Sequence, residues 1–198
     1  MLEQIQAADA TVMLGYHKRS DPATVCVKKE IDALNASGRL GAMRYIRVTM
    51  PAGDWIASGF DDLIAGEQAD APDYASLPQD PVDPDMDTDT WTAHVSFVNY
   101  YIHQVNLLRH LLNEDYHVTY ADPRGILLAG ESTSGIPCVI EMTPYQTSRD
   151  WQESALVCFD KGWVRLDLPA PLAANRPGRV EIFSDPGGST APETHVPQ

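Results

Sequence analysis

Four uncharged polar residues, Asn99, His103, Asn106 and His110, recur at spacings of three and four along residues 97–112, FVNYYIHQVNLLRHLL. These spacings place them on one side of an α-helix. A stripe that faces solvent usually carries lysine and glutamate, whereas amides and imidazoles suit a partly enclosed wall that makes directed hydrogen bonds. Because an imidazole can take up or release a proton near neutral pH, His103 is the candidate acid–base group. The same pattern also fits an ordinary amphipathic helix whose polar side lacks charge.

Two metal-binding interpretations of the sequence are disfavoured by spacing. His103 and His110 lie two helical turns apart and no carboxylate joins them, which does not match a zinc site. The acidic run DPDMDTDTWTAH (83–94) invites a calcium interpretation, but an EF-hand loop needs Gly at its sixth place and Glu at its twelfth. Those places hold Thr88 and His94, so a solvated acidic loop is favoured and no metal is expected.

The charge of the 198-residue chain is concentrated in one segment. The formal net charge is −14, and no Lys or Arg occurs between Arg47 and Arg109, where eleven acidic residues lie. Nucleic acid is therefore not an expected partner, because phosphate binding needs clustered cations. No apolar run reaches the roughly 20 residues of a membrane helix, so no membrane partner is expected. The first residues lack a signal-peptide pattern, which predicts a cytoplasmic location.

The cysteines argue against a disulfide framework. There are three, far apart in the sequence, and none forms a CxxC pair: Cys26, Cys138 and Cys158. Each lies in an apolar stretch, which favours packing in the core. Hydrophobic residues make up 43% of the chain, enough for a core of ordinary size.

The periodicity of the remaining segments predicts an α+β fold. Asp21-Pro22 predicts a helix start. The helix runs to about Gly38 and has its apolar side at Val25, Ile31 and Leu34. Ser134-Gly135 and Asp160-Lys161-Gly162 read as hairpin turns. Short strands are predicted at 11–16, 43–50, 116–121, 125–133, 137–143, 153–159, 162–168 and 179–184. We expect a largely antiparallel, open β-sheet with helices packed on one face.

A substrate and dimerisation domain is expected at 17–184, with an acidic excursion inside it and a further segment at each end. Residues 1–16 read as the end of a helix followed by a short buried strand. Residues 51–90 lack any sustained period and predict an acidic excursion, with one short helix near 60–65. The last fourteen residues, 185–198, are rich in Pro, Gly, Ser and Thr and predict a poorly ordered, flexible tail.

Two segments resemble the C-terminal half of the glucose–fructose oxidoreductase / inositol dehydrogenase family (Gfo/Idh/MocA). VMLGYHKRSDPA (12–23) resembles the family's last Rossmann strand and the crossing into its second domain. NYYIHQVNLL (99–108) resembles the family's D-x-G-x-H-x-x-D-L helix. The region 141–169 is similar to the family's sheet. The resemblance covers most of residues 11–184 and implies an NAD(P)-dependent sugar or polyol oxidoreductase.

The resemblance implies roles for particular side chains. His103 takes the place of the family's proton acceptor. Asn99 and Asn106 stand where the family has aspartates, and Asn cannot supply the negative charge that makes the histidine more basic. Lys18 and His17 take the place of substrate contacts, although a solvated turn fits Lys18-Arg19 equally well.

Aromatic side chains near strand ends are further candidates for the site. Four of them could stack against a sugar ring: Tyr16, Tyr145, Trp151 and Trp163. Core or interface packing is the commoner role of such aromatics.

The nucleotide-binding half of such an enzyme is not found in this sequence. None of the thirteen glycines forms GxGxxG, and the family's E-K-P motif is absent. Both would lie before residue 1, so a truncated chain or a cloned domain is expected, inactive with NAD or NADP by itself. Expected partners are a second copy through the sheet face, a Rossmann-domain chain, and a small sugar or polyol. The alternative is a stand-alone, non-catalytic module for small-ligand binding or assembly.

Overall fold

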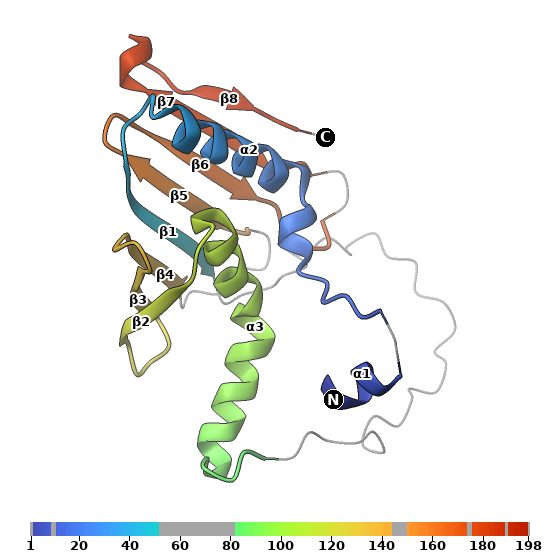
Figure 1. The fold of residues 1–198 in the computed structure, drawn as a ribbon. Helices are drawn as coiled ribbons and strands as arrows, with labels where there is room; N and C mark the ends of the chain where they lie inside the picture. The colour runs from blue at the N-terminus through green and yellow to red at the C-terminus, as the bar shows by residue number, and fades with distance from the viewer. Residues whose placement is uncertain are drawn as a thin grey trace.

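An eight-stranded sheet organises the chain (Figure 1). The computed structural model describes residues 2–8, 11–51, 82–143, 150–173, 176–188 and 190–197. The strands are β1 (Met43–Pro51), β2 (Tyr116–Ala121), β3 (Leu127–Ser132), β4 (Pro137–Thr143), β5 (Glu153–Phe159), β6 (Gly162–Leu168), β7 (Arg179–Ser184) and β8 (Glu193–His195). Their order in the sheet is β2-β3-β4-β1-β5-β6-β7-β8.

The sheet is almost entirely antiparallel, as the hairpin turns predict. Tight turns join β3 to β4 and β5 to β6, and both pairs are antiparallel. The only parallel contact among the paired strands is β1 with β4, in register from Ile46 opposite Cys138 to Pro51 opposite Thr143. A parallel pair needs a long crossover, and here the chain between β1 and β4 includes α3, β2 and β3. The predicted α+β class with a largely antiparallel open sheet is therefore confirmed.

Alternation along the strands separates a covered face from an open one. In β5, every second residue from Glu153 to Phe159 is buried and the residues between them are partly exposed. Period-2 alternation of this kind is typical of a sheet with one face against the core. The buried positions of β1, β4, β6 and β7 continue the same covered face.

Two helices cover that face. Helix α2 (Pro22–Ser37) contacts β6 and β7, and helix α3 (Thr88–Leu112) contacts β1 and β4 (Figure 1). Helix α2 begins as predicted, because the Asp21 side chain accepts a hydrogen bond from the Ala23 N–H at 2.8 Å. It ends at Gly38, whose φ of +63° is a left-handed conformation that glycine adopts without strain. Val25 differs from its predicted place on the apolar side: it is exposed, and Val27 is buried instead.

Helix α3 is longer than the predicted segment 97–112. It begins at Thr88, because the Asp87 carboxylate accepts a hydrogen bond from the Thr90 N–H at 2.7 Å. The acidic run at 83–94 is therefore half helical and not a solvated loop throughout. The first turns of α3 project past the sheet in Figure 1, and residues 92–96 are exposed.

Both ends of the chain differ from expectation. Residues 11–16 form no strand, and Val12, Met13 and Leu14 are exposed, because within the described chain no strand lies beside them. Helix α1 (Leu2–Ala7) precedes them. The tail contains a 3-10 turn, η3 (Asp185–Gly187), and β8 (Glu193–His195), which pairs with β7. The rest of the acidic excursion, with the helix expected near 60–65, falls at 52–81, outside the described residues.

Across the helices that the structure describes, none combines the length and apolar character needed to cross a bilayer.

Candidate functional site

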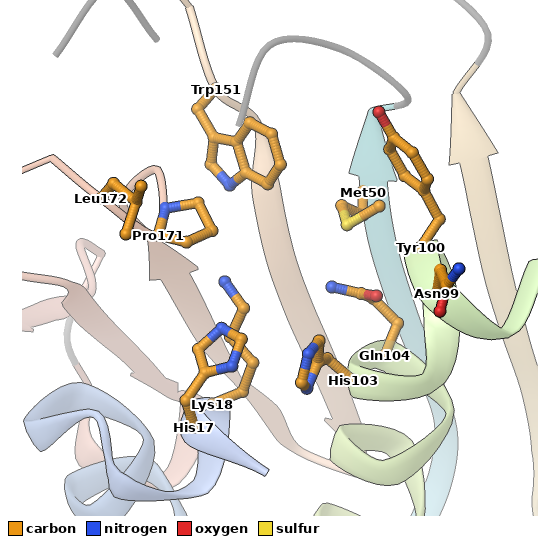
Figure 2. Close-up of a pocket in the computed structure, with 10 residues that line it drawn as sticks. All are labelled: His17, Lys18, Met50, Asn99, Tyr100, His103, Gln104, Trp151, Pro171 and Leu172. Atoms are coloured by element: carbon orange, nitrogen blue, oxygen red, sulfur yellow. The ribbon is translucent and has the colours of Figure 1, made fainter. Parts of the chain in front are cut away.

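A cavity of about 630 Å³ opens where α3, the 3-10 turn η1 (His17–Ser20) and the ends of β1 and β5 meet (Figure 2). Its size lies in the range of small-ligand sites. One side is polar and the other is mainly apolar. The lining residues are His17, Lys18, Met50, Asn99, Tyr100, His103, Gln104, Trp151, Pro171 and Leu172.

The 3-10 turn places a lysine in the floor of this cavity. Lys18 is the buried residue of η1, and its Nζ pairs with Glu153 Oε2 at the start of β5. The side chains are 6% and 0% exposed respectively. A solvated turn at Lys18, the alternative that the sequence left open, is therefore wrong.

Glu153 is held by donors from three segments. The Gln104 amide on α3 donates from Nε2 to Glu153 Oε1 at 2.6 Å. The indole of Trp151 donates from Nε1 to Oε2 at 3.1 Å, the oxygen that also accepts from Lys18. The Lys18 ammonium lies 5.9 Å from the centre of the Trp151 ring, within cation–π range. This fixed network joins the turn, the helix and the sheet below the cavity.

Two histidines from different elements lie face to edge beside this network. The His17 and His103 ring centres are 4.1 Å apart at an interplanar angle of 65°. Tyr16 contacts the other side of His103, edge-on, with the ring centres 6.4 Å apart. Figure 2 shows the two imidazoles together at the base of the cavity, next to Lys18.

Both imidazoles are held in the neutral form at neutral pH. Burial lowers the pKa of His103 from its ordinary value and the Lys18 charge lowers it further, whereas Glu153 opposes both effects. Burial also lowers the pKa of His17, with further lowering by His103 and Lys18. A neutral imidazole has one nitrogen with a free lone pair. His103 Nδ1 is buried and has no hydrogen-bond partner among the described residues. His103 also lines the cavity, so the lone pair of its neutral ring makes it the candidate to accept a proton or a hydrogen bond from a hydroxyl group.

The predicted stripe on α3 divides between two places. Asn99 and His103 line the cavity. Asn106 does not: its Oδ1 accepts a hydrogen bond from Arg19 Nε at 2.5 Å. His110 lies near Arg19 in a separate hollow lined also by Arg109 and Asp115. A helix turns by about 100° per residue, so a stripe four residues apart drifts around its axis and leaves the cavity. Tyr145 lies outside the described residues.

Two residues central to the site, Gln104 and Glu153, are absent from the sequence prediction, which includes Trp151 only as an aromatic candidate. Gln104 follows the candidate histidine on the helix and faces the core, only 1% exposed. Trp151 and Glu153 flank the start of β5. A usable signal exists for Glu153, because it occupies an inward position of the alternating strand 153–159, where an acidic residue needs a buried partner.

The described residues contain neither a metal centre nor a dinucleotide cradle. No group of three or more His, Cys, Asp or Glu is placed to hold a metal within the described ranges. A dinucleotide needs a glycine-rich turn between a strand and a helix N-terminus. Helix α2 follows a 3-10 turn instead, and α3 follows the acidic residues before Asp87. These residues do not fit a nicotinamide dinucleotide, so no hydride step is assigned to this chain.

Solved structures share this fold. The chain matches an oxidoreductase domain protein from Kribbella flavida with a TM-score of 0.56 and 15% identity, over 98% of this chain and 50% of that one. It matches an aldose-aldose oxidoreductase from Caulobacter crescentus, complexed with glycerol, with a TM-score of 0.55 and 16% identity, over 99% of this chain and 50% of that one. It also matches a levoglucosan dehydrogenase, complexed with NADH and levoglucosan, with a TM-score of 0.55 and 13% identity, over 93% of this chain and 46% of that one.

These matches define the fold and its extent. The chain spans about half the length of each of these three structures. The matched chains are Gfo/Idh/MocA-type oxidoreductases, so the predicted resemblance to a C-terminal domain of that family is confirmed for the fold. No protein-family model matches the sequence, and no curated protein sequence matches it either.

Proposed function

We propose that this chain, which has the fold of the C-terminal half of Gfo/Idh/MocA-type oxidoreductases, is the substrate-binding domain of an NAD(P)-dependent sugar or polyol oxidoreductase. The observation that carries the proposal is the cavity that joins His103, His17 and Lys18 on this fold. Two of the matched structures are named for sugars, an aldose and levoglucosan. The chain supplies the ligand pocket and the proton acceptor, and another polypeptide segment supplies the site that binds the dinucleotide.

Within this proposal, each polar side chain has a distinct task. His103 accepts the proton of a substrate hydroxyl, because its ring lines the cavity and in its neutral form has one nitrogen with a lone pair. Lys18 and Asn99 donate hydrogen bonds to other hydroxyls. His17 packs edge-on against His103 and limits its rotation. The aromatic wall at Trp151 packs against the apolar side of a ring.

The proposal includes an assembly role for the open face of the sheet. That face carries partly exposed apolar side chains, among them Leu156, Trp163 and Phe183, and the last two stack with ring centres 6.0 Å apart. A sheet face of this character favours pairing with a second copy. Sedimentation of the chain tests this role: a dimer that Trp163→Lys dissociates supports it, and a monomer contradicts it.

Calorimetric titration tests the main proposal. NADH and NADPH are titrated into the 198-residue chain, followed by glucose, myo-inositol and glycerol. We expect no heat from either nucleotide and saturable binding of at least one polyol, which His103→Ala weakens. Asn106→Ala is the matched control, because Asn106 lies on the same helix but outside the cavity. Tight nucleotide binding, or no binding of any polyol, would overturn the proposal.

A further inference from the structure

We infer that the cavity selects uncharged, hydroxyl-bearing rings over the carboxylated or phosphorylated forms of the same rings. This inference rests on the proposed sugar-binding function and specifies the substrate class of that site. Two features of the structure support it: the ion pair at the cavity, and the apolar side chains among the described residues that line it.

The ion pair removes the charge that an anion would need. Among the described lining residues, Lys18 is the only one with a fixed formal charge, since the lowered pKa values keep both histidines neutral. Its ammonium is paired with Glu153, whose side chain is fully buried. The Lys18–Glu153 pair is neutral as a unit. A ligand carboxylate placed at Lys18 would also face the Glu153 charge at close range, in surroundings where opposite and like charges are only weakly screened.

On the opposite wall, the described residues offer an anion no charge. It is built from Met50, Trp151, Pro171 and Leu172, which lie around the upper part of the cavity in Figure 2. Such surfaces bury the C–H face of a ring and exclude water from it. An anionic substituent against this wall would lose hydration without gaining a hydrogen bond.

Ligand titration by saturation-transfer NMR tests the inference. Glucose and glucuronate form the matched pair, because they differ only at C6, and glucose 6-phosphate adds a second anion. We expect the wild-type chain to bind glucose at least about tenfold more tightly than either anion, equivalent to about 1.4 kcal/mol. The preference should persist at high salt, because a buried pair is screened much less than the net charge of −14.

Three variants distinguish the effect of the Lys18–Glu153 pair on ligand preference from the effect of the net charge. Glu153→Gln leaves Lys18 uncompensated and should reduce the preference for glucose over glucuronate about tenfold. The double variant Lys18→Gln/Glu153→Gln is neutral again and should retain the wild-type preference. Glu131→Gln changes the net charge equally on the exposed side of β3 and should change nothing. If Glu153→Gln does not fold, the salt dependence and the double variant decide.

The outcomes distinguish the inference from the proposed function. Equal or tighter binding of glucuronate by the wild-type chain would refute the inference and leave the sugar-binding function standing. A preference that high salt abolishes would also refute it, because the net charge would then be its cause. Failure of every sugar to bind would overturn both.

Discussion

Replacing Lys18 by methionine should destabilise the fold through the carboxylate that it leaves behind. Glu153 has no exposed side-chain surface and loses its countercharge in this variant. Removing one partner of a buried pair typically costs about 3–5 kcal/mol. Gln104 and Trp151 still donate to the carboxylate, so we expect the lower end, about 3 kcal/mol. A domain with roughly 5–15 kcal/mol of stability still folds after this loss.

Urea unfolding, followed by circular dichroism and tryptophan fluorescence, measures this effect. With a slope of about 2 kcal/mol per molar urea, the midpoint should fall by about 1.5 M. Lys28→Met is the matched control, because Lys28 pairs with Asp32 one turn away on α2, and the Asp32 side chain that it leaves behind is 52% exposed. That pair contributes only about 0.3–0.5 kcal/mol, so its loss should barely move the midpoint.

The double variant Lys18→Met/Glu153→Gln completes the cycle. It contains no buried charge, and the glutamine oxygen still accepts from Gln104 or Trp151. We expect it to recover at least half of the stability that Lys18→Met loses. A loss below about 1 kcal/mol in Lys18→Met, or strict additivity in the cycle, would refute the buried-pair argument.

Three other predictions follow from the same geometry. The imidazoles of His17 and His103 should titrate below their ordinary pKa in NMR spectra. Because the unfolded chain then binds protons at a higher pH than the folded chain, the free energy of unfolding should fall as the pH drops below about 6.5. This fall should be smaller in His103→Gln. Gly162→Ala should cost about 1–3 kcal/mol in urea unfolding, because its Cβ would lie 2.2 Å from a carbonyl oxygen of β7, whereas Gly15→Ala, with open space around it, should cost far less. Trp151→Phe should lower stability by about 1 kcal/mol through the lost indole hydrogen bond to the buried carboxylate, and an unchanged midpoint would contradict that bond.

Local patterns in the sequence determined most of the fold. The strands at 116–121, 137–143, 153–159, 162–168 and 179–184 have the predicted bounds, because period-2 alternation reflects which side chains a strand turns to the core. Hairpin turns fix antiparallel neighbours without any long-range information. The helix face that carries Asn99 and His103 was likewise predictable, because spacing alone places residues on a helix.

Contacts between distant segments decided the site. Lys18 and Glu153 are 135 residues apart, and neither sequence neighbourhood reveals that the other residue will neutralise it. The same holds for Gln104. Its position on the helix lies beside the polar stripe, but the packing of the fold buries it. Residues 12–14 show the converse. Their apolar run predicts a buried strand, yet these residues are exposed, because a strand forms only where a neighbouring strand supplies hydrogen bonds and covers its side chains. Sequence periodicity specifies which side chains each segment can bury. Tertiary packing determines which other segment covers those side chains.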